Sequence, residues 1–432
     1  MTTTAPAPQV YGGDEVATLV IDTGSSFTRV GYAGEDTPKL VVSTECGLVP
    51  DEDVEMEDDT SSTPKKAKQY KVGDAANLPL PNMEVLHPLT DGIVADWEAV
   101  QNIWEYSLNR LNADTKSHPL MLTEPCWNTQ ANKLKALEIA FESLEVPASY
   151  LVKDAVASAF AAGKGNALVL DVGSEVASVT PVIDGLVLYK PARRSQYAGD
   201  YLDRQIKKVL VSRGIDLTPR FEIKSKEAVK LGESPVFTKR ELPNITQSFT
   251  DLQVSRILTE FKDSMCQVND VPLTPEISGE AAERVFEFPT GYSTTFGADR
   301  LSTSESLFKP SEYPFDGETV PDTARGLSEM VVDTINASNV DVRAHLANNI
   351  VITGGGSLVQ GLSDRVSKDV TQALSGLKIR VAASSNQEER RHGAWIGGSV
   401  LGSLGSFHQL WVSKQEWQEK GGDYLVEKRR FK

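Results

Sequence analysis

Two aspartates each end an apolar segment of nearly the same sequence, and both are followed by small turn residues. The copies are residues 19–25 (LVIDTGS), which contain Asp22, and residues 168–174 (LVLDVGS), which contain Asp171. A buried strand that opens into Gly and Ser exposes consecutive backbone N–H groups that bind an anion, and an aspartate at its tip holds a metal ion through water. Two such tips that face each other would bind one nucleoside triphosphate with its metal ion.

A third apolar segment also ends in a glycine turn, residues 349–357 (NIVITGGGS). A single strand followed by Asp-x-Gly-Ser is a weak signal, because most such turns bind no ligand. Three related turns in one chain, together with the small-residue motif at 395–399 (WIGGS), favour nucleotide binding. For any one of these motifs alone, an ordinary turn stays the alternative.

The elements around these turns recur in the same order in the two halves of the chain. Each half opens with a predicted hairpin, formed by strands 16–22 and 27–33 in the first half and by strands 167–171 and 176–182 in the second. Apolar residues at helical spacing predict helices over residues 97–111, 132–144, 155–162, 200–213, 252–268 and 323–338. Hairpins and helices in two similar halves predict duplicated α/β lobes around a cleft.

The composition is that of a globular protein with an acidic surface. The chain has 432 residues, 40% of them hydrophobic, which is enough for two or more domains. Its formal net charge of −16 argues against strong autonomous DNA binding, because affinity for phosphates comes from clustered Lys and Arg, and favours basic partners such as histones. Three scattered cysteines predict reduced thiols in a cytosolic or nuclear protein. Without an apolar run of membrane length or a signal-peptide pattern, we expect neither secretion nor membrane insertion.

A charged segment follows the first hairpin. Seven of the nine residues 51–59 (DEDVEMEDD) are acidic, and residues 60–68 (TSSTPKKAK) offer no apolar face. We therefore expect a disordered surface insertion here, and a flexible tail at residues 1–10. A solvated loop is favoured for the acidic run, with contact to basic histone tails as the alternative. The short lysine cluster is only a weak nuclear-import signal.

The motifs resemble the actin superfamily, whose two-lobed ATPase fold is shared by hexokinases and seventy-kilodalton heat-shock chaperones. Besides the three turns, the resemblance rests on residues 31–34 (GYAG) and above all on 395–399 (WIGGS) with 411–416 (WVSKQE), a pair that separates actins and actin-related proteins from distant members. The resemblance covers nearly the whole chain except the acidic insertion and an enlarged segment at about 215–316. The opening residues 11–16 (YGGDEV) and the acidic insertion resemble the nuclear actin-related proteins.

The resemblance implies an α/β protein with an actin-like two-lobed ATPase fold, built from duplicated RNase H-like domains around a nucleotide cleft. It divides the chain into four subdomains. In order they are residues 1–43, 88–148 and 392–432 for subdomain 1, residues 44–87 with the acidic insertion for subdomain 2, residues 149–197 and 317–391 for subdomain 3, and residues 198–316 for an enlarged subdomain 4.

The resemblance also implies that ATP and Mg²⁺ bind in the cleft. Asp22 and Asp171 would orient the water ligands of Mg²⁺, and Arg29 replaces a phosphate-contacting lysine of the family. The residues expected around the nucleotide come from the two hairpin turns, the glycine turn and the adenosine pocket, and they are Thr23, Gly24, Ser25, Ser26, Phe27, Arg29, Gly173, Ser174, Glu175, Val176, Gly199, Lys262, Asp263, Gly354, Gly355, Gly356 and Arg391. Taken singly, Lys262, Asp263 and Arg391 are better explained as solvated helix charges.

Two positions that support hydrolysis in actins differ here. Actins use a glutamine on the helix after the Thr-Glu loop to orient the attacking water and a histidine after the second hairpin to relay its proton. The matching positions hold Glu138 and Ser178. An ionised glutamate only accepts hydrogen bonds, and a serine takes up no proton near neutrality. Ser174 also replaces an aspartate near the metal. We therefore expect no working catalytic residues and very slow ATP turnover, with Glu138 as a general base of raised pKa as the alternative.

The resemblance further predicts a subunit that does not polymerise. The acidic insertion replaces the loop that clasps the next protomer in actin filaments, and residues 312–318 (EYPFDGE) replace an apolar plug. An apolar groove between residues 132–146 and 395–412 implies docking of the helicase-SANT-associated helix of a remodeller or scaffold subunit, beside actin. The alternative is that the apolar side chains of this region are ordinary core, namely Trp395, Ile396, Leu401, Leu404 and Phe407.

The sequence thus favours an ATP-binding, non-filamentous nuclear subunit of chromatin-remodelling and histone acetyltransferase complexes. An ATP-hydrolysing, filament-forming cytoskeletal actin-like protein is the alternative. A phosphotransferase of the sugar-kinase type comes third, and the motifs at 395–399 and 411–416 disfavour it.

Overall fold

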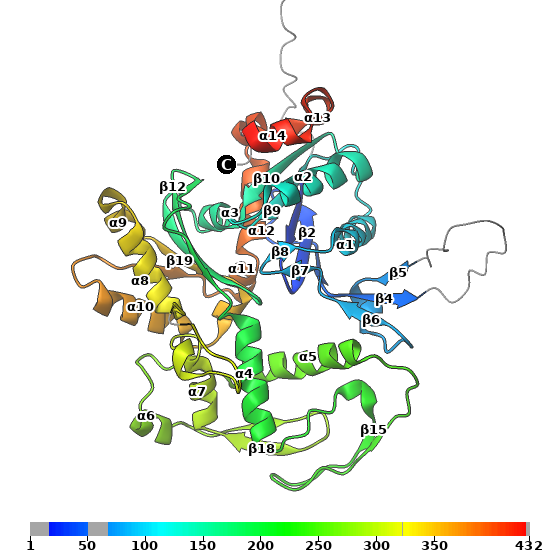
Figure 1. Ribbon diagram of the computed structural model, residues 1–432, viewed down its shortest axis with the longest axis vertical. Coiled ribbons are helices and arrows are strands. Elements are labelled where there is room, and N and C mark those ends of the chain that lie inside the picture. The colour runs from blue at the N-terminus through cyan, green and yellow to red at the C-terminus, as the bar shows by residue number, and fades with distance from the viewer. Residues whose placement is uncertain (1–16, 51–67, 322, 429–432) are drawn as a thin grey trace, which may run out of the picture.

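The computed structural model describes residues 17–50, 68–321 and 323–428. Two six-stranded sheets with their covering helices form two lobes, and smaller sheets extend from them (Figure 1). The predicted tail at residues 1–10 and the predicted acidic insertion at 51–59 lie outside the described residues. No helix among the residues that are described is long and apolar enough to span a bilayer.

The first lobe is built on a sheet in which parallel strands follow a hairpin. β1 (Leu19–Thr23) pairs antiparallel with β2 (Phe27–Tyr32) and parallel with β9 (Leu120–Glu124). β10 (Ala148–Lys153) pairs parallel with β9, so the predicted subdomain boundary at residue 148 cuts a strand that belongs wholly to this sheet. The order is β21-β10-β9-β1-β2-β3, with edge strands β3 (Leu40–Ser43) and β21 (Val412–Ser413).

The second lobe repeats this topology. β11 (Ala167–Val172) pairs antiparallel with β12 (Ala177–Ile183) and parallel with β19 (Ile350–Thr353), which pairs parallel with β20 (Val381–Ala383). Short strands β13 (Leu186–Val187) and β14 (Arg193–Ser195) extend it beside β12. Both predicted hairpins are therefore present, and the predicted duplicated α/β architecture is confirmed.

Helices α3 (Asp154–Ala161) and α12 (Gly393–Ser403) pack closely against each other. A Cβ atom on Gly397 would lie 1.7 Å from the carbonyl oxygen of Ala157, so only glycine permits this contact. The other predicted helices are also present with shifted ends, and they are α1 (Trp97–Arg110), α2 (Gln130–Glu138) continued by a π-helical turn (Ile139–Ser143), α4 (Gly199–Ser212), α5 (Gln247–Met265) and α8 (Leu327–Ala337).

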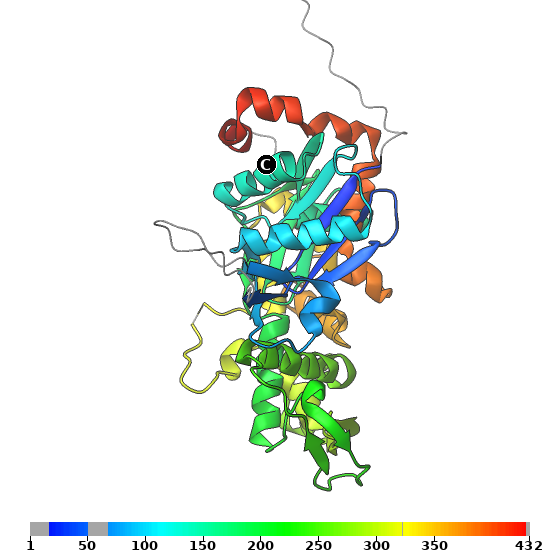
Figure 2. The same ribbon diagram turned by 90° about the vertical axis from the view of Figure 1, so that its right-hand side faces the viewer.

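Smaller elements extend the lobes. Figure 2 shows α4, α5 and the hairpins below them at the end opposite to α13 (Lys414–Lys420) and α14 (Gly422–Lys428). The remaining strands and longer helices are β4 (Cys46–Pro50), β5 (Lys68–Lys71), β6 (Glu84–Leu86), β7 (Leu89–Thr90), β8 (Ile93–Val94), β15 (Ile223–Lys226), β16 (Phe237–Lys239), β17 (Arg284–Glu287), β18 (Ser293–Phe296), α6 (Pro275–Gly279), α7 (Ala298–Glu305), α9 (Val340–Ala347), α10 (Leu362–Ala373) and α11 (Gln387–Arg391).

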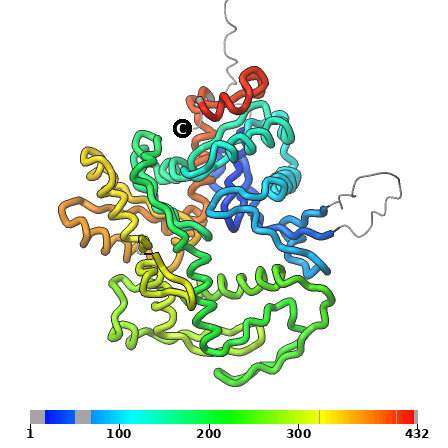
Figure 3. The backbone as a smooth tube through the Cα atoms, in the orientation of Figure 1, coloured from blue at the N-terminus to red at the C-terminus, as the bar shows by residue number. Residues whose placement is uncertain are grey.

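The two lobes approach each other where β6 meets the start of α5, as the path of the backbone shows (Figure 3). Met83 and Phe249 are fully buried in one cluster there. Backbone and side chain also bond across it, since the Asn82 N–H donates to the carbonyl of Asn244 (2.8 Å) and the Val85 N–H donates to Ser248 Oγ (3.0 Å). The lobes are therefore tied to each other on the side of the small β4–β6 sheet.

Candidate functional site

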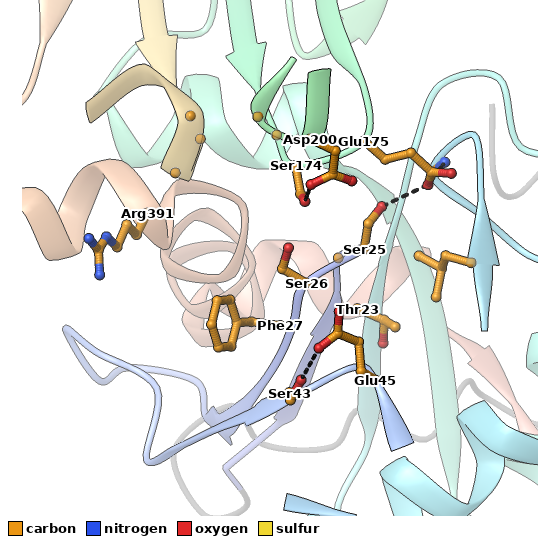
Figure 4. A pocket seen from close by; sticks show the side chains of 18 of the residues that line it. Thr23, Ser25, Ser26, Phe27, Ser43, Glu45, Ser174, Glu175, Asp200 and Arg391 are labelled. Carbon is orange, nitrogen blue, oxygen red and sulfur yellow. Dashed lines mark hydrogen bonds between the residues drawn. The ribbon is translucent and has the colours of Figure 1, made fainter. Parts of the chain in front are cut away.

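One cleft of about 1120 Å³ lies between the lobes. Figure 4 shows the turn of the first hairpin, with Ser25 and Phe27, facing Ser174 and Glu175 of the second hairpin. All seventeen residues predicted around the nucleotide line this cleft, and so do Asp22 and Asp171. The tertiary structure thus gathers residues from six separate segments of the sequence into a single site.

Glu138 does not line the cleft in this structure, and its role as the changed water-orienting position stays a prediction. It is the last residue of α2, and its carboxylate accepts a hydrogen bond from Lys135 Nζ at 2.8 Å. The helix packs on the core of the first lobe through Ala136 and Leu137, which does not bring its end to the hairpin turns. Ser178, the other changed position, is buried and does line the cleft.

Asp154 is the carboxylate that the structure brings to the cleft instead. It begins α3 directly after β10, and the carboxyl ends of parallel strands meet at one edge of a sheet. Burial raises the pKa of Asp154 well above its ordinary value, and the charges of Asp171 and Asp22 raise it further. The sequence held a signal for this residue, because Asp154 ends an apolar strand just as Asp22 and Asp171 do.

In the first hairpin, the aspartate is fully partnered. Arg29 Nη1 donates to Asp22 Oδ2 at 3.0 Å, and Thr123 Oγ1 donates to Asp22 Oδ1 at 2.6 Å. The turn itself is fixed by the Gly24 N–H, which donates to the carbonyl of Phe27 (3.0 Å). Thr44 Oγ1 donates to the carbonyl of Gly24 (2.7 Å), so the turn is supported from the next strand connection as well.

In the second hairpin, Asp171 forms no ion pair with any of the described residues. Burial and the neighbouring Asp22 raise the pKa of Asp171 to about 6, and Arg29 opposes this shift. The start of α4 braces the turn, because the Gly199 N–H donates to the carbonyl of Gly173 (3.1 Å) and the Asp200 N–H donates to that of Ser174 (2.7 Å). The phosphate end of the cleft therefore carries more carboxylates than cations.

A buried histidine, His392, connects the first hairpin to α11 and α12. Arg29 Nε donates to His392 Nδ1 at 2.7 Å, and His392 Nε2 lies 2.8 Å from Glu388 Oε2. Since an arginine nitrogen only donates, Nδ1 is the acceptor and the imidazole proton sits on Nε2, where it donates to Glu388. Burial and then Arg29 lower the pKa of His392, which favours this neutral form.

At the predicted adenosine end of the cleft, the charge of Lys262 is balanced by an ion pair with Asp203. Its Nζ donates to Asp203 Oδ2 at 2.8 Å, and Arg391 lies 3.8 Å from Asp263. Burial raises the pKa of Asp203 to about 6 although Lys262 opposes the shift. Asp203 was not among the predicted residues, and its place in α4, where it shares a face with Gly199, is the only signal that the sequence offered.

Comparison with known proteins identifies the fold family. The actin family model matches residues 13–431. The chain belongs to the actin family. Its relatives include Actin-related protein 4 from Yarrowia lipolytica, 94% identical over the full length of both chains, and Actin-related protein 4 from Arabidopsis thaliana, 38% identical over 97% of this chain and 100% of that one. Actin-related protein 4 from Schizosaccharomyces pombe is 35% identical over 97% and 98%. The predicted actin-like fold and membership among actin-related proteins are thus confirmed.

The cleft of this actin-family chain fits the phosphates and sugar of a nucleotide. Gly354 has a φ of 90°, and a Cβ atom there would lie 2.2 Å from Asp171 Oδ1. The next residue, Gly355, has open space on its Cβ side while it lines the cleft. A glycine turn of this kind lets backbone approach a ligand closely, as phosphate-binding turns require.

The donor set at the strand tips suits a hydrated cation rather than one bound directly by protein. Asp22 and Asp171 line the same cleft and are close enough for each charge to act on the other. Within residues 17–50, 68–321 and 323–428, no three His, Cys, Asp or Glu side chains form a cluster that would hold a metal ion. Two carboxylates that contact Mg²⁺ through its water shell are compatible with this geometry.

Proposed function

We propose that this actin-family chain binds Mg·ATP as a structural ligand and serves as a non-filamentous nuclear subunit of chromatin-remodelling and histone acetyltransferase complexes. The observation that carries the proposal is the convergence of both hairpin turns and the glycine turn on one cleft. Its relatives named Actin-related protein 4 support a role as an actin-related protein rather than as an actin filament.

In this proposal, the turns at 23–27 and 173–176 hold the phosphates through backbone N–H groups, and the glycine turn at 354–356 receives the sugar side. Mg²⁺ supplies charge neutralisation for the phosphate oxygens when it is bound. Asp22 and Asp171 orient its water ligands, and Arg29 adds a cationic side chain at this end. Lys262, Asp263 and Arg391 line the adenosine end.

The residues at the phosphate end support slow turnover. Glu138 replaces the water-orienting glutamine of actins, and an ionised carboxylate accepts hydrogen bonds but donates none. Ser178 lies opposite Asp171 in the hairpin register and takes up no proton near neutral pH. A bound ligand at 1,000 times its dissociation constant stabilises a protein by about 4 kcal/mol, which is enough to hold two lobes together without being consumed.

The nucleotide released on denaturation tests this part of the proposal. We expect one equivalent of ATP per chain rather than ADP, and phosphate release far below that of filament-forming actin. Asp171→Ala should abolish nucleotide retention, with the exposed Asp316→Ala as the matched control. Steady phosphate release at the rate of filamentous actin, lost in Asp171→Ala, would instead support the ATP-hydrolysing cytoskeletal alternative.

Exposed apolar residues near α12–α14 support docking of a partner helix. Val400, Leu404, Leu410 and Tyr424 are each more than one third exposed, whereas Trp395 and Leu401 of the predicted groove are core. In the proposal, this surface takes the helicase-SANT-associated helix, beside actin. The segment that replaces the family's apolar plug is held on α4, where Phe315 packs on Tyr201 and under Arg204, which supports a chain that does not polymerise.

Co-expression tests the partners. We expect the chain, actin and a helicase-SANT-associated helix to elute as a one-to-one-to-one complex in gel filtration, and Leu404→Asp to weaken it. Val285→Asp, which changes an exposed apolar residue on β17, is the control. Failure to associate with both partners, or pelleting of filaments by the isolated chain, would overturn this part. Contact with histones, which the net charge of −16 supports, is tested by histone pull-down. Nuclear localisation is tested by imaging.

A further inference from the structure

A glutamate of the second lobe hydrogen-bonds to the first lobe at the phosphate end of the cleft. Glu175 belongs to the turn of the second hairpin, yet its Oε2 accepts from Ser25 Oγ at 3.1 Å and from the Gly92 N–H at 3.0 Å. Figure 4 shows the Glu175 side chain reaching toward Ser25 across the cleft. One anionic oxygen thus ties the second hairpin to two donors of the first lobe.

The donors that Glu175 occupies suit a phosphate oxygen equally well. Ser25 lies in the turn that the proposed function assigns to the phosphates, and a hydroxyl and a backbone N–H are ordinary donors to phosphate. In a closed nucleotide site, a terminal phosphate held from both sides would link the lobes through such donors. Here a carboxylate of the chain itself makes this link.

The Gly92 donor is held firmly in place. Trp127 Nε1 donates to the carbonyl of Asp91 at 2.9 Å, and the carboxylate of Asp91 pairs with Arg194 at 2.9 Å. The guanidinium of Arg194 lies over the ring of Trp127, 5.2 Å from its centroid. Gly92 itself has a φ of 70°, so the turn depends on glycine as well. The bond to Glu175 therefore ends on a rigid turn and restrains the second hairpin.

We propose that Glu175 stands in for the terminal phosphate of the nucleotide in linking the lobes, so that this chain closes on Mg·ADP as well as on Mg·ATP. The inference rests on the proposed nucleotide site and concerns whether that site distinguishes ATP from ADP. A γ-phosphate adds little to closure because the link already exists, and its charge is opposed by the carboxylate. The chain then keeps one conformation whichever nucleotide it holds, as a structural ligand requires.

Paired affinities for Mg·ATP and Mg·ADP test the proposal. In the unaltered protein, the two dissociation constants should agree within about threefold. Glu175→Ala removes the link, so ADP affinity should fall and the ratio should move about tenfold toward ATP, since a hydrogen bond to a charged group is worth at least that factor. Glu175→Gln keeps the shape and removes the charge, so ATP affinity should rise relative to ADP. The exposed Glu142→Gln is the matched control and should leave the ratio unchanged.

Thermal unfolding gives a second readout that does not depend on turnover. The unaltered protein should unfold at nearly the same temperature with either nucleotide, whereas Glu175→Ala should be stabilised clearly more by Mg·ATP than by Mg·ADP. Equal changes of both affinities in both variants would show that Glu175 is only a structural tie and would overturn the inference while leaving the nucleotide site intact. A protein that binds neither nucleotide would overturn the proposed function as well.

Discussion

The two hairpins at the phosphate end of the cleft share one backbone plan and differ in charge. In the first, the antiparallel register places Arg29 opposite Asp22, and in the second the same register places Ser178 opposite Asp171. Asp22 therefore has a cationic partner, whereas the pKa of Asp171 is raised to about 6 by burial and by Asp22. A duplicated fold thus keeps its backbone geometry while the charge of its aspartate is balanced by an arginine in the first lobe and opposed by burial in the second.

The neighbouring strands show the same division. Thr123, at the end of β9, donates its hydroxyl to Asp22 at 2.6 Å. Thr353, at the end of β19 and in register with Asp171, donates instead to the carbonyl of Arg390 at 3.0 Å. The threonine of the second lobe therefore donates to the backbone and not to the aspartate beside it. Equivalent residues in a duplicated fold therefore have different hydrogen-bond partners in the two lobes.

The largest expected difference between the lobes is in the tolerance of their turns to an added methyl group. Gly354→Ala should destabilise the nucleotide-free protein by about 3 kcal/mol, because of its φ of 90° and a Cβ contact at 2.2 Å with Asp171 Oδ1. Gly24→Ala in the first hairpin should cost less than about 1 kcal/mol, since its nearest contact would be 3.3 Å. Urea unfolding measures both, and equal losses would contradict the comparison.

Removal of divalent cations should have the next largest effect. The phosphate end carries Asp22, Asp154, Asp171 and Glu175 against Arg29, so a triphosphate without Mg²⁺ meets a net negative surface. We expect ATP affinity to fall at least about 100-fold in EDTA. Adenosine, which lacks phosphates, is the control, and its affinity should not change. ATP affinity that is the same in EDTA and in Mg²⁺ would show that the carboxylates of the second lobe do not need a cation.

A pH experiment sharpens the comparison at the other end of the second lobe, where the pKa of Asp203 is raised to about 6. This folded-state pKa lies above the pKa of about 4 in the unfolded chain. The contribution of Asp203 to the unfolding free energy is therefore fully present below pH 4 and is lost as the pH rises toward 6. The unfolding free energy of the wild type relative to Asp203→Asn should therefore fall by about 1.5 kcal/mol between pH 5 and pH 7.5. A difference that is constant or that rises with pH would contradict this sign.

The smallest expected effect separates the two threonines. Thr123→Val removes a hydrogen bond to a charged carboxylate, and Thr353→Val removes one to a backbone carbonyl. The first change should cost about 1 kcal/mol more than the second, because bonds to charged groups are stronger. Chemical unfolding of both variants measures the difference. If Thr353→Val proves the costlier change, the first lobe is not the one that balances its aspartate through local donors.

Most of the fold was open to prediction because its signals are local. The apolar strands that end in Asp22 and Asp171, the turns after them and the helical spacing at 97–111 each follow from short-range rules of burial and backbone freedom. The subdomain boundaries stay predictions, apart from the one at residue 148, which divides β10. The water-orienting role of Glu138 also stays a prediction, since this residue does not line the cleft.

The sequence by itself determined the pair of Asp-turn hairpins and the glycine turn, since each depends on residues a few positions apart, and from these turns it predicted a phosphate-type site. Only the tertiary structure decided that Asp154 joins the aspartates, that Arg29 is shared by Asp22 and His392, and that Glu175 reaches Ser25 and Gly92. The physical reason is that charge acts through space. Burial and proximity set the pKa values and partners of these groups, and both depend on how distant strands are brought together.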